Sequence, residues 1–169
     1  MKIYFRQKAI GSINHIQLVA GSVFLICGLF IYLLVRCPDQ IFFIYTFHLP
    51  SFYDQYHEKL FAVLSNNLPS FLHACSFSFL TCAFLPLQSR KKIAMVCLGW
   101  ATINVLCEIG QLMTPNTNIP LPIQKNTLIL KYFRYGTFDI MDIVFTLIGC
   151  CFAYCILIKT SKGGKNEII

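Results

Sequence analysis

Polar side chains that could do acid–base or ligand-binding chemistry interrupt the apolar segments of this 169-residue chain. Asn104, Glu108 and Gln111 are spaced at i, i+4 and i+7, so a helix presents all three on one face. A carboxyl group inside an apolar segment needs a partner or a proton, and burial raises its pKa toward the range of a general acid or base. Glu108 is therefore interpreted as a functional or organising group.

A second polar stripe follows in the last apolar segment, where Asp139, Asp142 and Thr146 are spaced at i, i+3 and i+7 and share a helical face. Asp139 has a structural alternative, because a carboxylate at a helix start accepts hydrogen bonds from free backbone N–H groups. The basic groups available to pair with these acids are His73, near the start of an earlier apolar segment, and Arg134, just before the last one.

Other candidates also have structural alternatives. Asn104 and Gln111 suit hydrogen bonds between membrane helices, and His73 could be a structural histidine with its hydrogen bonds satisfied. Against this, an ionisable residue inside a membrane span is costly and is a functional hypothesis by default. If the polar faces turn inward, we expect one outward-facing polar pocket. Its candidate residues are His73, Asn104, Glu108, Gln111, Arg134, Asp139, Asp142 and Thr146.

The elements that must position these residues follow from the composition. Hydrophobic residues make up 56% of the chain and charged residues 12%, whereas a soluble domain has about 25% charged residues. An ordinary soluble globule and a disordered chain are both excluded. A helix needs about 20 mostly apolar residues to cross a bilayer. We therefore predict an all-α, polytopic membrane protein, a single-domain bundle of four transmembrane helices. The predicted spans are about 15–35, 70–87, 93–113 and 139–158.

The positions of the 14 Lys and Arg residues predict the orientation of these spans. Nine of the 14 lie near the N-terminus, at 90–92, or after the last span; of the other five, Arg36 follows the first span and four lie in the loops 37–69 and 114–138. The positive-inside rule then places both termini in the cytoplasm and both long loops outside. The net charge of +7 is thus explained by topology. No nucleic-acid-binding motif is present in the sequence.

The first outer loop contains a further predicted helix. Residues 53–64 form an amphipathic pattern, with Tyr53, Tyr56, Leu60 and Val63 on one face, which favours a helix lying on the outer leaflet. Pro69 then suits the first turn of the next membrane span.

Cysteine usage favours packing over chemistry. Eight of the nine cysteines fall inside predicted spans, where Cys behaves as a small hydrophobe. No CxxC or Cys/His spacing is typical of zinc, so we expect no metal and no cofactor.

The polar spacing resembles that of the VanZ-like family of small bacterial membrane proteins. That family shares a Glu-x-x-Gln, an Arg, and an Asp-x-x-x-Asn-x-x-Gly pattern across two consecutive helices, after a helix that contains a His. The matching region covers roughly residues 68–155. Its matching residues are His73, Glu108, Gln111, Arg134, Phe138, Asp139, Asp142, Thr146 and Gly149.

The chain departs from the family pattern at three places. Thr146 stands where the family usually has Asn, no Asp-Lys precedes His73, and the segment between Gln111 and Arg134 is longer than usual. The resemblance implies a four-helix protein of the bacterial inner membrane that is linked to the cell envelope. Some members of the family lower susceptibility to teicoplanin, and these departures place the chain at a distance from them.

Three classes of function fit this description. The first is a non-catalytic envelope protein that binds membrane lipids, a lipid-linked or peptide ligand, or a membrane partner through its outer pocket. Here carboxylates would meet cationic groups, and His73 and Arg134 would meet anionic ones. The second is an enzyme doing acid–base or metal-assisted chemistry on an outer-leaflet lipid-linked substrate, although no HExxH or Gly-x-Ser-x-Gly signature is present. The third, an ion-coupled transporter, has no internal repeat to support it.

Overall fold

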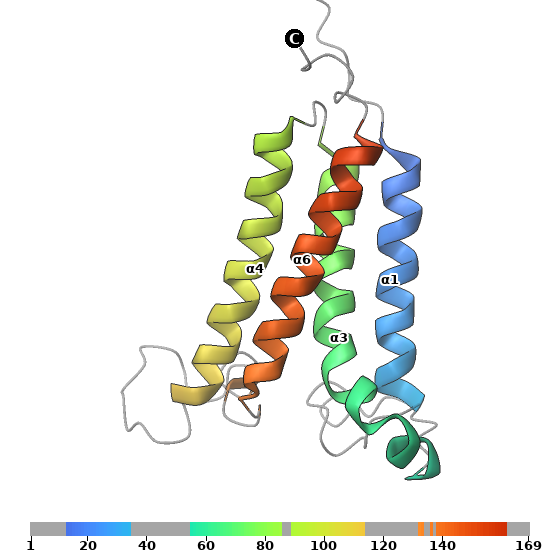
Figure 1. Ribbon diagram of the computed structural model, residues 1–169, viewed down its shortest axis with the longest axis vertical. Helices are drawn as coiled ribbons and strands as arrows, with labels where there is room; N and C mark the ends of the chain where they lie inside the picture. Colours follow the sequence, from blue (N-terminus) through green and yellow to red (C-terminus); the bar gives the residue numbers. More distant parts are fainter. Residues whose placement is uncertain are drawn as a thin grey trace, which may run out of the picture.

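Four helices form the described part of the chain, running alternately up and down in a bundle (Figure 1). They are α1 (His15–Leu34), α3 (Gln55–Ala83), α4 (Arg90–Met113) and α6 (Ile140–Thr160). The computed structural model describes residues 13–34, 55–85, 89–113, 132–133, 136 and 138–161, with side chains from residue 66 onward in α3 and up to residue 112 in α4. The helical prediction is confirmed for these residues.

Small residues set the contact between α1 and α3. A Cβ atom at Gly21 would lie 2.8 Å from Cγ of Leu80, and one at Gly28 would lie 3.5 Å from the ring of His73. The two glycines are seven residues apart, two helical turns, so both lie on the face that meets α3. This close approach is the usual way in which helices associate where hydrophobic burial gives no driving force.

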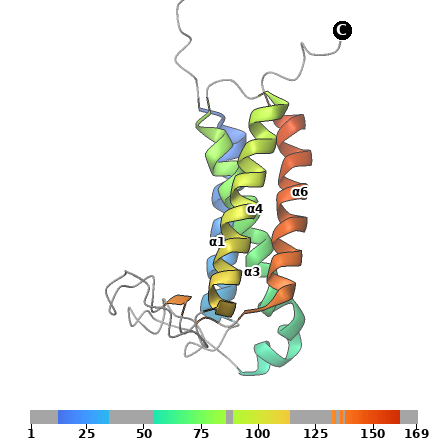
Figure 2. The ribbon, with the colours of Figure 1, turned by 90° about the vertical axis from the view of Figure 1, so that its left-hand side faces the viewer.

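Helix α3 is the most enclosed helix of the bundle, packing against α1, α6 and α4. Figure 2 shows it between α1 and α6. At the α3–α6 contact, a Cβ at Gly149 would lie 2.7 Å from the carbonyl oxygen of Phe71, and the Cys75 thiol donates to the Gly149 carbonyl at 3.3 Å. The core between α3, α4 and α6 consists of Ala74, Cys75, Phe79, Cys82, Ile93, Cys97, Ala101, Cys150, Ala153 and Leu157.

The outward faces of the other three helices are apolar. Ile16 on α1 is 69% exposed and Leu98 on α4 is 68% exposed, and α6 exposes Leu147 and Ile148 in the same way. Within the described residues, three helices are long and apolar enough to cross a membrane, namely His15–Leu34, Arg90–Leu112 and Ile140–Thr160. An apolar exterior around a core that contains Ser and Cys is the arrangement expected in lipid.

The prediction that Pro69 lies in the first turn of a helix was wrong. Helix α3 begins at Gln55 rather than near Ser70, and Pro69 lies inside it. Proline lacks the N–H that would bond to the carbonyl four residues earlier, so a helix that continues through it bends. Figure 1 shows the first turns of α3 lying across the axis of the bundle. The predicted separate amphipathic helix is, from Gln55 onward, the first part of this same helix.

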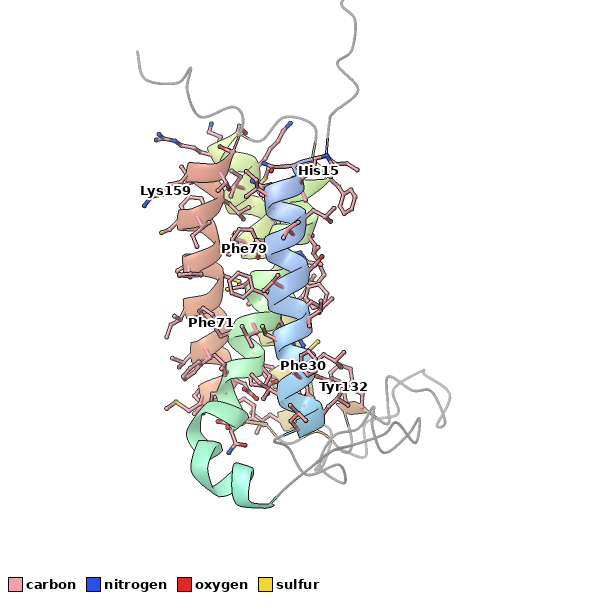
Figure 3. The ribbon with its side chains drawn as sticks, turned by 90° about the vertical axis from the view of Figure 1, so that its right-hand side faces the viewer. His15, Phe30, Phe71, Phe79, Tyr132 and Lys159 are labelled. Atoms are coloured by element: carbon pink, nitrogen blue, oxygen red, sulfur yellow. The ribbon has the colours of Figure 1, made fainter. Side chains whose placement is uncertain are left out.

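Charge is segregated between the two ends of the bundle. Arg90, Lys91 and Lys92 begin α4 and Lys159 lies in the last turn of α6; Figure 3 shows His15 and Lys159 at this same end. Glu108, Asp139 and Asp142 lie toward the opposite end, near the end of α4 and the start of α6. We call this second end the acidic end.

At the end of the bundle opposite the acidic end, partly buried hydrogen bonds join three helices. The Asn14 backbone N–H donates to the Ala83 carbonyl at 3.0 Å, and its side-chain amide donates to the Thr160 carbonyl at 3.1 Å. The fully buried Gln17 donates to the Thr160 hydroxyl at 3.2 Å. These bonds join the start of α1 to the ends of α3 and α6, where backbone carbonyls have no partner within their own helix.

Candidate functional site at the acidic end

The acids of α4 and α6 meet where α6 begins. The backbone N–H of Asp139 donates to Oε2 of Glu108 at 3.4 Å, and the Asp139 carboxylate accepts from the Met141 N–H at 2.9 Å. Asp139 is therefore the N-cap of α6, the structural role that the sequence left open. A carboxylate at this position is also favoured by the helix dipole.

Asp142, one turn into α6, pairs with α3. The Ser70 hydroxyl donates to its Oδ1 at 2.6 Å, a length typical of a strong bond to an ionised acceptor. Ser70 was missed by sequence reasoning, although it directly follows Pro69 and lies three residues before His73, on the same side of the helix. The pair fixes the start of α6 against α3.

Gln111 and Tyr132 form a second contact beside Glu108. Gln111 is only 5% exposed, and a Cβ at Gly136 would lie 2.6 Å from its Cδ, so a larger residue at position 136 would displace the Gln111 side chain. Tyr132 hydrogen-bonds with the Gln111 side chain. Burial raises the pKa of Tyr132 to about 12, with smaller contributions in the same direction from Cys107, Glu108 and Tyr32. Its phenol is therefore a neutral hydrogen-bond donor over the whole physiological range.

His73 of α3 faces α1 rather than the carboxylates of the acidic end. Its ring stacks on Tyr32, with centroids 5.6 Å apart and 24° between the planes, and it lies beside Gly28. Tyr32 in turn is close enough to Tyr132 to interact with it electrostatically, as is Glu108. His73 thus reaches the acidic end through two intervening tyrosines, neither of which was singled out from the sequence.

The remaining candidates have individual placements. Asn104 donates its amide to the Trp100 carbonyl of its own helix at 2.8 Å. Thr146 is 3% exposed, two turns beyond Asp139 and inside the bundle. Arg134 lies outside the described residues. The structure therefore brings together Glu108, Gln111, Asp139 and Tyr132, and ties Asp142 to α3 a turn away.

Cysteine and acid side chains form no metal centre in the described ranges, where no group of three or more His, Cys, Asp or Glu residues is placed to hold a metal ion. Cys75, Cys82, Cys97 and Cys150 are buried free thiols. They fill the space between α3, α4 and α6 as small apolar groups.

No protein-family model, no curated protein and no solved structure matches the chain. The site must therefore be interpreted from its own geometry, and the resemblance to the VanZ-like family stays a proposal.

Proposed function

We propose that this chain is a VanZ-like, multi-pass protein of the bacterial inner membrane, with four transmembrane helices. Three helices are long and apolar enough to cross a membrane. The proposal that α3 crosses as well is supported by its position, because its small polar residues Ser76 and Ser78 are fully buried among the other helices. A helix that other helices cover does not need an apolar surface of its own.

In this proposal both termini are cytoplasmic and the first turns of α3 lie on the outer membrane surface. The orientation is supported by the bases at one end of the bundle, since Arg90, Lys91, Lys92 and Lys159 directly flank helix ends. The surface placement is supported by the direction of α3 before Pro69, which runs across the bundle axis (Figure 1).

The proposed function is non-catalytic binding at the outer surface of a lipid-linked or peptide ligand, or of a membrane partner, that presents an amine or another cationic group. The observation that carries it is the hydrogen bond from the backbone N–H of Asp139 to the Glu108 carboxylate, which places an acid of α4 at the start of α6, beside a second acidic residue. A carboxylate accepts several hydrogen bonds at once. Glu108 and Asp139 can therefore hold the helix start and still accept from an ammonium group.

Native mass spectrometry of the protein purified from bacterial membranes in mild detergent tests this function. We expect the wild type to retain an amine-bearing species and Glu108→Gln to lose it, because a hydrogen bond to a charged group contributes about 1.5–3 kcal/mol, or roughly tenfold or more in affinity. Glu167→Gln makes the same chemical change far along the sequence and should retain the species. Equal retention by all three proteins would refute the function.

An acid–base enzyme acting on an outer-leaflet lipid-linked substrate is the second candidate. The observation behind it is the interaction of the Tyr132 phenol with Glu108, which places a hydrogen-bond donor for a substrate oxygen near a carboxylate base. The two candidates differ in Tyr132→Phe. An enzyme would then accumulate unconverted substrate in the retained fraction, whereas a binding protein would retain the same species as the wild type.

A further inference from the structure

The side of α3 that lies between α1 and α4 is only partly covered by side chains of these two helices. Helices α1 and α4 each pack on α3 but make almost no contact with each other. On α3, His73, Phe77 and Thr81 are four residues apart and half-buried, so they form one stripe. Neighbouring positions such as Cys75 and Phe79 are at most 1% exposed.

Aromatic rings run continuously along this stripe. Tyr32 of α1 stacks on His73 at 5.6 Å, His73 contacts Phe77 at 6.1 Å, and Phe77 stacks on Trp100 of α4 at 4.7 Å. The indole N–H of Trp100 donates to Thr81 at 2.9 Å. We call Tyr32, His73, Phe77 and Trp100 the aromatic ladder.

The ladder has the dimensions of one leaflet. From His73 to Thr81 the helix rises about 12 Å, and half of a hydrocarbon core of roughly 30 Å is about 15 Å. One end of the ladder reaches the acidic end through Tyr132, which interacts with both Tyr32 and Glu108. Figure 3 shows Tyr132 beside the C-terminal end of α1, on the side away from α6.

We propose that one hydrocarbon chain of a lipid whose headgroup carries an ammonium group lies along the aromatic ladder between α1 and α4. This inference rests on the proposed function. It places the hydrocarbon chain of a ligand whose headgroup binds the carboxylates at the adjoining acidic end. The complementary charges select such a lipid over an anionic one, and the half-buried rings offer flat apolar faces to its chain.

A helix of a second copy fits this surface less well. Where helices of this chain do approach closely, glycines make the contact: Gly21 and Gly28 against α3, and Gly149 against Phe71. Helix association in membranes depends on such small residues. The ladder instead presents bulky rings, which would hold another helix at a distance and leave gaps that a flexible chain fills.

The only tryptophan of the chain, Trp100, reports on this position. The wild-type protein is reconstituted into phosphatidylglycerol vesicles that contain a small fraction of phosphatidylethanolamine brominated in its acyl chains, since bromine quenches tryptophan fluorescence on contact. We expect stronger quenching by this lipid than by phosphatidylglycerol brominated at the same positions. A tenfold preference, equal to about 1.4 kcal/mol, would raise occupancy at about 5 mol% from roughly 5% to roughly a third.

The matched control moves the reporter to the lipid-facing side of the same helix. Trp100→Phe combined with Leu98→Trp places the indole two residues away, at a position that is 68% exposed in the native chain. This reporter should be quenched equally by both brominated lipids, because it samples bulk lipid. Circular dichroism establishes that the double variant is folded.

Two results distinguish binding of a hydrocarbon chain along the aromatic ladder from binding of a headgroup at the acidic end. Quenching of Trp100 that never exceeds that of the Leu98→Trp reporter, with either lipid, overturns the proposal, even if Glu108→Gln loses a retained species in mass spectrometry and the proposed function stands. Preferential quenching of Trp100 by the phosphatidylethanolamine that is abolished in Phe77→Ala supports the ladder. That support holds whether or not a ligand survives purification.

Discussion

The Ser70 hydroxyl and the Asp142 carboxylate are joined by a hydrogen bond of 2.6 Å that fixes α6 against α3 directly after the bend at Pro69. This contact links the only helix that bends at a proline in the described bundle to one of the acids at its acidic end. Loss of this hydrogen bond should lower the stability of the protein and change the position of the Asp142 carboxylate.

Ser70→Ala should destabilise the protein by about 1.5–3 kcal/mol, the contribution of a hydrogen bond to a charged group in a partly buried place. Thermal unfolding in detergent, followed by circular dichroism, measures the change. Thr102→Ala removes a hydroxyl that bonds only within its own exposed helix surface and should change stability by less than about 0.5 kcal/mol. Equal losses of stability in the two variants would show that the Ser70–Asp142 hydrogen bond contributes no more than a bond on the exposed helix surface.

Gly149→Ala should separate α3 from α6, because the added Cβ would lie 2.7 Å from the Phe71 carbonyl oxygen. Overpacking of this kind costs about 1–3 kcal/mol. Gly99→Ala is the control, since a Cβ there meets nothing within 4 Å, and alanine should stabilise that helix by roughly 0.5–1 kcal/mol. The opposite signs of the two alanine substitutions are measured in the same unfolding assay.

Stability should fall at high pH through Tyr132. Its pKa is about 12 in the folded protein and about 10 in an unfolded chain, so the group stabilises the fold fully below pH 10. Between pH 10 and 12 the unfolded state loses the proton first, and this contribution is lost as the pH rises. Tyr132→Phe should lack that dependence. Unfolding measured from pH 8 to 12 for both proteins would contradict the assignment if the two curves ran parallel.

Reporter fusions test the four-span topology. Alkaline phosphatase, which is active only outside the cytoplasm, should be active when fused after residue 50 or residue 126 and inactive when fused after residue 88 or at the C-terminus. A green fluorescent protein should give the opposite pattern. If α3 did not cross, the fusions after residue 88, after residue 126 and at the C-terminus would all change sides, which distinguishes three spans from four.

Local sequence patterns were sufficient for the three helices that are long and apolar enough to cross a membrane. The prediction for α1, α4 and α6 came within three residues of the observed bounds, because each is a long segment in which few charges interrupt the apolar run. Helix α3 was placed wrongly at its start, because a proline that suits a first turn is equally compatible with a bend when the neighbouring helices hold both sides in place.

The candidate site was only partly accessible from the sequence. Spacing placed Glu108 and Asp139 toward the same end, and their hydrogen bond follows from how α4 and α6 pack. Ser70, Tyr32 and Tyr132 could not be found in this way, since their contacts join segments far apart in the chain and no periodicity encodes them. The orientation of His73 toward α1 depends on Gly28, whose meaning becomes clear only once the two helices are paired.

The two glycines of α1 also have a consequence for biogenesis. Helix α1 leaves the ribosome before the other three described helices and is long and apolar enough to cross a membrane, whereas α3 contains fully buried serines that lipid does not accommodate well. The glycine-lined face of α1 therefore offers α3 a docking template already present in the membrane when α3 is synthesised. In the proposed four-span topology, α3 therefore meets its main partner, α1, already in place when it is synthesised.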